Sequence, residues 1–280
     1  MWRMCVFTVM LPDMAPEEAA RAMKAAGYAG VEWRVKNTPE PVRAEAPSFW
    51  GNNLCTFGLT TAEAEQARDV AQAHGLAIPG LGTYIEVGDV AAVEEAMAFA
   101  RICGAGQVRV GAGRWPVEGS YAASFDRARA FLGEAQGLAR QYGVKVVVEI
   151  HHRTIVPSAA LAHRLVSGLE PDYVGVIHDA GNMVHEGFEE YRLGLELLGP
   201  YLAHVHLKNA AWERPPGGGV WRARWAALED GVVDWPALFA ALRAVGYEGW
   251  LGIEDFSQAR PPAEALALNY QFVRSQVGEG

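Results

Sequence analysis

The sequence contains little cysteine. Three residues of this type, Cys5, Cys55 and Cys103, occur in 280 positions, and none of them forms a C-x-x-C pair. An odd number without paired spacing argues against a disulfide framework and against a zinc site built from thiolates. This pattern fits a reducing compartment, and we predict a cytoplasmic protein.

Long hydrophobic runs are also missing. A membrane-spanning helix needs about 18–20 consecutive apolar residues, and no stretch of this sequence reaches that length. The first residues, MWRMCVFTVMLPDM, include one basic residue and no A-x-A-like cleavage site. We expect this segment to form a strand and not a signal peptide, and we predict no association with a membrane.

Positive charge is scarce as well. The sequence has 24 Lys and Arg residues against 33 Asp and Glu residues, which gives a formal net charge of −9. Proteins that bind nucleic acid or membrane surfaces without specificity usually carry a basic footprint. The acidic balance therefore favours a small-molecule substrate over a nucleic acid.

A glycine-rich phosphate-binding turn is absent after the first predicted strand, where the sequence reads TVMLPDM. This absence argues against an open nucleotide-binding sheet. Instead, short β-branched runs alternate with Ala-rich helical segments, several of which begin with start signals such as Pro16, Thr60 and Ser158. The predicted strands are residues 3–9, 30–34, 76–82, 107–111, 144–150, 174–178, 203–207 and 250–254, and the predicted helices are residues 15–26, 61–74, 90–103, 121–142, 158–168, 187–198, 235–245 and 262–276.

Strands that are connected through helices pair in parallel. Eight such units, repeated without a break in composition, predict an α/β fold, a closed (β/α)8 TIM barrel formed by residues 1–280 as a single domain. Residues 35–59 and 208–234 form two long segments after predicted strands, and both are rich in aromatic side chains. We expect them to act as lids, with packing covers or contacts in a homodimer as the alternatives.

Metal-competent side chains lie at the ends of four successive predicted strands. They are Glu149, Asp179, His206 and Glu254. Three carboxylates directed at a common centre would repel one another unless a cation lay between them. We therefore predict one divalent metal ion, with Mn²⁺ favoured by the oxygen-rich donor set and Co²⁺, Mg²⁺ or Zn²⁺ as alternatives.

Strand alternation predicts which neighbours share the inner face. His151 should point inward with Glu149, whereas His152 should point outward. Lys208 shares a face with His206 and is the best candidate for a substrate contact, and His185 lies close enough in sequence to reach the mouth. Glu32 and Glu86, at the ends of earlier strands, fit either support of the ligands or salt bridges.

Five sequence segments resemble the xylose isomerase-like TIM barrels, the superfamily of sugar phosphate isomerases and epimerases. They are GYAGVEWR, VVVEIHHRT, VGVIHDAGNM, HVHLKN and GYEGWLGIEDF. The resemblance covers essentially the whole chain and is most specific in its second half. It implies that the four residues above are the metal ligands and that Glu149 and Glu254 also form the catalytic acid/base pair.

The chemistry implied is proton abstraction next to a carbonyl, through a metal-held enediolate. Return of the proton gives an epimerase or isomerase of a small hydroxy-carbonyl compound, a sugar or a sugar acid, which we expect foremost. Loss of a hydroxyl group gives a dehydratase of the inosose or dehydroshikimate type. A barrel that binds a sugar without turnover is a further alternative.

Two positions depart from the sugar 3-epimerases of this superfamily. Asn182 stands where they have a histidine, and Ile155 stands where they have a glutamate that contacts free ketose. The endonuclease IV-like phosphodiesterases of the same superfamily use three metal ions and extra histidines, which LGTYIEVGD and VRVGAGRW do not supply. We therefore expect neither a free-ketohexose 3-epimerase nor a repair nuclease.

Cationic residues gather at the same ends of the predicted strands. They include Arg34, Arg109, Arg114, Arg153, Lys208, Arg222 and Arg224. One or two of them would bind an anionic substrate, and the alternative is that they neutralise acids such as Glu32, Glu86 and Glu149. The predicted substrate-binding residues are Lys208, His151, Asn182, Arg109 and Arg222.

Overall fold

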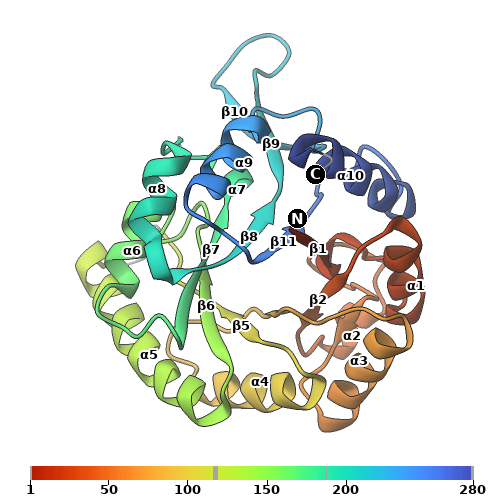
Figure 1. Ribbon diagram of the computed structural model, residues 1–280, viewed down its shortest axis with the longest axis vertical. Coiled ribbons are helices and arrows are strands. Elements are labelled where there is room, and N and C mark those ends of the chain that lie inside the picture. The colour runs from red at the N-terminus through yellow and green to blue at the C-terminus, as the bar shows by residue number, and fades with distance from the viewer. Residues whose placement is uncertain (1, 116–118, 187, 279–280) are drawn as a thin grey trace.

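A closed barrel of parallel strands forms the centre of the protein. The computed structural model describes residues 2–115, 119–186 and 188–278. The strands pair in the order β1-β11-β8-β7-β6-β5-β4-β2, and β2 pairs with β1 and so closes the ring, with β3 attached outside β2. Helices surround this ring (Figure 1). The predicted (β/α)8 barrel is therefore confirmed.

The elements have the following bounds. The strands are β1 Arg3–Phe7, β2 Gly30–Val35, β3 Thr56–Phe57, β4 Leu81–Gly82, β5 Gln107–Val110, β6 Lys145–Glu149, β7 Val174–Asp179, β8 Leu202–Leu207, β9 Asn209–Glu213, β10 Arg222–Ala226 and β11 Trp250–Ile253. The helices are α1 Pro16–Ala26, α2 Glu40–Arg43, α3 Thr61–Ala73, α4 Val90–Cys103, α5 Tyr121–Tyr142, α6 Ala159–Val166, α7 Ala180–Met183, α8 Tyr191–Leu198, α9 Trp235–Ala244 and α10 Pro262–Val277, with short 3-10 turns at Thr8–Met10 and Gly199–Tyr201.

The predicted helix start signals operate as expected. Pro16 occupies the first turn of α1, where its missing N–H is not needed. The Thr60 hydroxyl accepts a hydrogen bond from the backbone N–H of Glu63, and the Ser158 hydroxyl accepts one from the backbone N–H of Leu161. These contacts satisfy backbone donors that a helix leaves unpaired at its first turn.

The structure corrects several predicted boundaries. Strand β4 covers only Leu81–Gly82 of the predicted 76–82, because the residues before it make a single bridge to β2 at Ala77. The helix predicted from residue 187 begins at Tyr191, and residue 187 itself lies outside the described residues. Both long loops hold regular structure: α2 and β3 lie within 35–59, and the antiparallel hairpin β9–β10 lies within 208–234.

The hydrophobic core consists of buried side chains from the barrel strands and from the faces of the helices that pack against them. All three cysteines are buried with free thiols. Within the described part of the chain, no helix combines the length and apolar character that crossing a bilayer requires. Strands β2 and β7 are buried at every position, so the polar side chains on their inner faces lie inside the protein.

Candidate metal centre

Four predicted ligands meet inside the barrel. Glu149, Asp179, His206 and Glu254 each offer one donor atom, and these atoms all lie within 4.8 Å of one another. His206 Nδ1 is 3.1 Å from a Glu149 oxygen, 3.9 Å from a Glu254 oxygen and 4.0 Å from an Asp179 oxygen. The four come from the neighbouring strands β6, β7 and β8 and from the residue after β11. The structure therefore brings together the four residues that the sequence places at strand ends.

Asp179 uses its two carboxylate oxygens differently. Oδ1 accepts a hydrogen bond of 2.8 Å from the backbone N–H of Asn182 and so caps the short helix α7. Oδ2 faces the other three ligands and lies 2.7 Å from Lys208 Nζ. The turn composition after β7 and the carboxylate at its end thus serve two purposes, a local cap and a donor at the centre.

Asn182 lies beneath the centre. Its Nδ2 donates to Asp179 Oδ2 at 2.9 Å, to Glu149 Oε1 at 3.3 Å and to the backbone carbonyl of Ile150 at 3.1 Å. The side chain is almost completely buried. Asn182 therefore orients two candidate ligands, and it is not among the residues that line the cavity described below.

Two cationic side chains pair with the candidate ligands. Arg109 Nη1 donates to Glu149 Oε2 at 2.6 Å, and Lys208 Nζ donates to Glu254 Oε2 at 2.6 Å. Burial raises the pKa of Glu149, but the opposing effect of the Arg109 guanidinium and of His206 and Lys208 holds it well below its usual range. The sequence left two alternatives for Arg109, binding an anionic substrate or neutralising a nearby acid. The structure shows the second contact, with Glu149.

The charge balance fits a divalent cation. The centre holds four buried carboxylates (Glu32, Glu149, Asp179, Glu254) and, apart from histidine, two cationic ion-pair partners among the described residues (Arg109, Lys208). When all six are ionised, negative charge exceeds positive charge by two. Burial, together with repulsion from Glu149 and Glu254, raises the pKa of Asp179 to about 7, although the cation of Lys208 acts in the opposite direction. A cation among these donors would relieve that repulsion, and oxygen donors with one imidazole suit several divalent metals.

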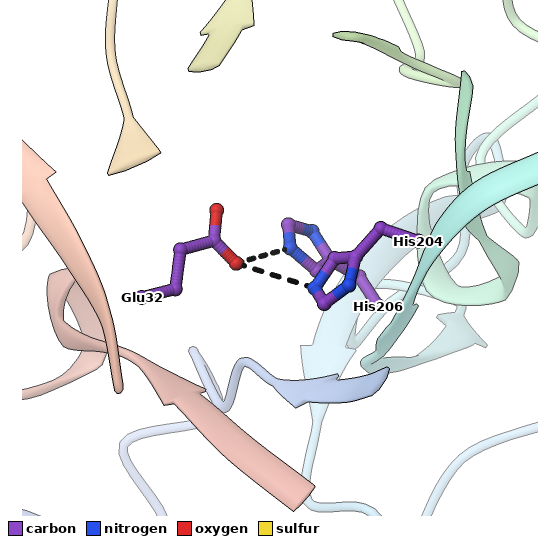
Figure 2. Close-up of side chains that lie close together, drawn as sticks. All are labelled: Glu32, His204 and His206. Atoms are coloured by element: carbon purple, nitrogen blue, oxygen red, sulfur yellow. Dashed lines mark hydrogen bonds and ion pairs between the residues drawn. The ribbon is translucent and has the colours of Figure 1, made fainter. Parts of the chain in front are cut away.

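Glu32 contacts the centre from the opposite wall of the barrel. Its Oε2 faces both imidazoles (Figure 2) and lies 2.9 Å from His206 Nε2 and 3.4 Å from His204 Nε2. His206 therefore has a carboxylate at each ring nitrogen. The sequence left Glu32 and Glu86 open between ligand support and salt bridges. Glu32 contacts a ligand, whereas Glu86 is exposed and pairs with Arg114 at 3.9 Å.

A large cavity opens above the centre. Its volume is about 1010 Å³, and it is lined by aromatic walls, cationic side chains and two of the four candidate ligands, Glu149 and Glu254. Both long segments contribute a tryptophan to this wall, Trp50 from 35–59 and Trp225 from 208–234. Phe256 lies between them, with ring centroids 4.9 and 5.7 Å away. These contacts place both predicted lids at the cavity rim.

The structure also shows the positions of two further histidines, His152 and His185. His152 was expected to point outward, but it lines the cavity, and its Nδ1 lies 3.2 Å from Asn182 Oδ1. Strand β6 ends at Glu149, so alternation no longer applies in the following turn, where Arg153 adopts a positive φ of 56°. His185 stacks on His152 with centroids 4.0 Å apart, but it is not among the residues that line the cavity.

The remaining predicted substrate-binding residues fall into two groups. His151, Arg109 and Lys208 line the cavity. Arg222 lies exposed on the β10 strand of the hairpin and is not among the lining residues, so the structure does not bring it to the centre. The orienting role of Asn182 was not predicted and that of Glu32 was left as one of two alternatives, because partners far apart in sequence show no spacing signal.

A buried set of acidic and imidazole donors at the carboxyl ends of barrel strands defines a class of metal-binding barrel proteins. The profile of the family described as xylose isomerase-like TIM barrel matches residues 20–276. The match spans nearly the whole barrel, and the chain belongs to this family.

Individual relatives are more distant. An inosose dehydratase from Geobacillus thermodenitrificans is 29% identical over 164 residues, which cover 52% of this chain and 53% of that protein. The chain thus matches about half the length of this curated relative. The crystal structure of a 3-keto-D-glucoside 4-epimerase from E. coli superposes with a TM-score of 0.73 at 18% identity, covering 98% of this chain and 100% of that one. The zinc-bound IOLI protein gives a TM-score of 0.75 at 17% identity and 98% coverage of both chains. At these identities the structures support the fold alone.

Proposed function

We propose that the protein is a divalent-metal-dependent isomerase or epimerase of a small hydroxy-carbonyl compound, a sugar or a sugar acid. The observation that carries this proposal is the accessibility of the centre. Of the four candidate ligands, Glu149 and Glu254 line the cavity, whereas Asp179 and His206 lie behind them. A substrate in the cavity would therefore meet two carboxylates, the pair that proton transfer requires.

Positioning of the two carboxylates suits transfer across one carbon atom. Glu149 ends β6 and Glu254 follows β11, and strands β7 and β8 separate them, so they approach the cavity from different directions. When bound, a divalent cation would polarise the substrate carbonyl and acidify the neighbouring C–H bond. We favour Mn²⁺ because three of the four donors are carboxylates.

The proton would then move between the substrate and the two carboxylates. Glu149, kept ionised by Arg109, accepts the proton as the C–H bond breaks. Glu254, in its carboxylic acid form, delivers its proton to the opposite face of the same carbon and so reforms the C–H bond with inverted configuration, after which proton exchange with solvent restores both side chains. Delivery to the neighbouring carbon exchanges an aldehyde for a ketone. Neither outcome needs an oxidant or a reductant.

Other cavity residues would hold the substrate in place. Lys208, directly after β8, presents N–H donors beside Glu254 and would hydrogen-bond a substrate hydroxyl or carboxylate. His151 and Arg109 also line the cavity and can contribute polar contacts. The aromatic rings of Trp50 and Trp225 provide flat apolar surfaces for the C–H face of the substrate. In this arrangement the two long segments would exclude water by closing over the substrate.

A dehydratase is the second candidate, and the curated relatives favour it. The matched relatives from Geobacillus thermodenitrificans and Lacticaseibacillus casei are inosose dehydratases. In that reaction Glu149 would remove the C–H proton while the C–O bond on the next carbon breaks. The departing hydroxide would take a proton from the carboxylic acid form of Glu254, so that water leaves and a C=C bond forms.

Mass spectrometry in D₂O distinguishes these reactions. The Mn²⁺-loaded protein is incubated with small ketoses, hydroxypyruvate and inososes. Incorporation of one deuterium without loss of water supports the isomerase or epimerase, and loss of one water supports the dehydratase. Glu149→Gln should abolish either change, whereas Glu196→Gln, on the exposed surface of α8 and outside the cavity lining, should preserve it. A compound that binds but keeps its mass would contradict the proposal and favour a barrel that binds sugars without turnover.

A further inference from the structure

Glu32 is a carboxylate buried in an unusual setting. It belongs to the fully buried strand β2 and is 1% exposed. Among the described residues, its ion-pair partners are His204 and His206 on β8, and neither lysine nor arginine pairs with it. A buried carboxylate without hydrogen-bond donors is costly, and the imidazole of His206 supplies one at 2.9 Å, while His204 Nε2 lies 3.4 Å away as an ion-pair partner.

The contact with Glu32 determines which nitrogen of His206 keeps its proton when a cation binds. A carboxylate only accepts hydrogen bonds, so Nε2, 2.9 Å from Glu32 Oε2, keeps its proton, whereas a cation among the candidate ligands would replace the proton of Nδ1. The other nitrogen, Nδ1, faces the cluster of candidate ligands, where Glu149 Oε1 is 3.1 Å away. With Nε2 protonated, the lone pair of Nδ1 is directed at the position that the cation would occupy.

Two further contacts fix the plane of the His206 ring. Phe7 from β1 stacks against it with centroids 6.1 Å apart and planes 19° from parallel. Gly252 on β11 provides the space, since a Cβ there would lie 2.7 Å from His204 Nε2 and 2.9 Å from His206 Cδ2. The ring is therefore held by Glu32 at one nitrogen, by Phe7 on one face and by the close passage of β11.

We infer that Glu32 is a positioning residue, which fixes the tautomer and orientation of His206 so that Nδ1 ligates the cation. His204 lies beside the same carboxylate as an ion-pair partner, with its ring edge-on to His206 and the ring centroids 5.1 Å apart (Figure 2). The inference rests on the metal site of the proposed function, but not on the reaction that the site performs. Metal-ligating histidines are commonly oriented by a carboxylate in this way.

The same three side chains also form a candidate ligand set of their own. Donor atoms of Glu32, His204 and His206 lie within 4.8 Å of one another. A second ion there would require His206 to bridge two cations and to lose both ring protons. A hydrogen bond from Nε2 to Glu32 explains the same distances without this requirement, and ion counting separates the two arrangements.

The test compares Glu32→Gln and Glu32→Leu with wild type and with Glu86→Gln as the matched control. Glu32→Gln keeps an acceptor oxygen but loses the charge, and Glu32→Leu loses both. Zn²⁺ affinity is measured by competition with a chelator, ion content by elemental mass spectrometry, and the His206 tautomer by ¹⁵N NMR of the Zn²⁺-loaded protein. Thermal unfolding without metal shows whether each variant is folded.

We expect one ion per chain throughout, with Zn²⁺ affinity falling by about 10–100-fold in Glu32→Leu and by less in Glu32→Gln. Wild type should show Nε2 protonated, Glu32→Leu a mixture of tautomers, and Glu86→Gln no change. Wild-type affinity and tautomer in a folded Glu32→Leu protein would overturn the inference. Two ions in wild type, with one lost in Glu32→Leu, would also overturn it. These readouts need no substrate, so a protein that binds Zn²⁺ as expected but turns nothing over would contradict only the proposed function.

Discussion

The two halves of the barrel wall contribute differently to the centre. Strands β6, β7, β8 and β11 are neighbours, and each delivers one candidate ligand at or just after its end. From the other half, β2 supplies Glu32, β5 supplies Arg109 and β1 supplies Phe7, and each of these contacts a ligand. One half thus holds the donors and the other holds them in position. A site divided in this way exists only when the barrel is closed.

The largest effect should follow from a change in the ligand-bearing half, such as Asp179→Asn. The cap on α7 needs an oxygen at the Oδ1 position, so the amide nitrogen turns toward the cation and cannot ligate it. We expect Zn²⁺ or Mn²⁺ affinity to fall by more than the roughly 100-fold typical of losing an outer partner. Isothermal titration calorimetry measures this.

The control for that variant is Asp234→Asn. Asp234 caps α9 through the backbone N–H of Ala237 but lies outside the centre, so this variant should bind metal as wild type does. Metal affinity in Asp179→Asn equal to that of the control would remove Asp179 from the ligand set.

In the opposite half, Arg109→Leu should destabilise the metal-free protein. Arg109 and Glu149 are both largely buried, and removal of one partner leaves an uncompensated charge. Such losses cost about 3–5 kcal/mol, and the double variant with Glu149→Gln should recover part of this. Urea unfolding measures both.

Arg192→Leu is the matched control for Arg109→Leu, because Arg192 forms an exposed pair with Glu196 on α8. That loss should be much smaller than the loss in Arg109→Leu, because an exposed pair is screened by solvent. Equal losses of unfolding free energy in Arg109→Leu and Arg192→Leu would mean that the buried pair of Arg109 and Glu149 does not stabilise the protein.

A third prediction concerns the outer face of the ligand-bearing half. His178 on β7 is completely buried, and burial lowers its pKa from 6.5 to about 4. Between these values the unfolded chain binds a proton that the folded protein does not, so stability is full above pH 6.5 and falls as the pH drops toward 4. This one group accounts for about 3 kcal/mol.

His178→Leu should reduce the loss of stability over that pH range by a similar amount, while the stability difference between variant and wild type stays constant above pH 7. Urea unfolding at a series of pH values measures this. Parallel pH profiles for the two proteins would show that His178 is not the titrating group.

The smallest effect is expected at the hairpin. Arg222 is exposed on β10 and does not line the cavity, whereas Lys208 is buried and pairs with two candidate ligands. With any substrate that is turned over, Arg222→Ala should leave KM within about twofold, a change smaller than 0.5 kcal/mol. Lys208→Met should alter both kcat and KM. A large rise in KM for Arg222→Ala would show that the hairpin folds over the cavity.

The sequence was sufficient to predict the barrel and its candidate ligands. Both predictions rest on local signals. Side chains alternate between two faces along each strand, and Asp179 and Glu254 each lie at or directly after the end of a strand. The prediction was wrong for His152, since it extended strand alternation past the end of β6 into a turn. It also treated residues 208–234 as a loop, although they contain a β-hairpin.

The amino-acid sequence by itself determined which side chains reach the centre, because alternation along each strand and the shared direction of parallel strands act within short segments. The tertiary structure alone decided how those side chains are held. Glu32 and His206 are 174 residues apart and meet only across the closed barrel. Arg109 forms its ion pair with Glu149, and not with another nearby acid, because strands β5 and β6 pair in a specific register. Such contacts depend on the distances between strands, and a linear pattern of residues does not contain them.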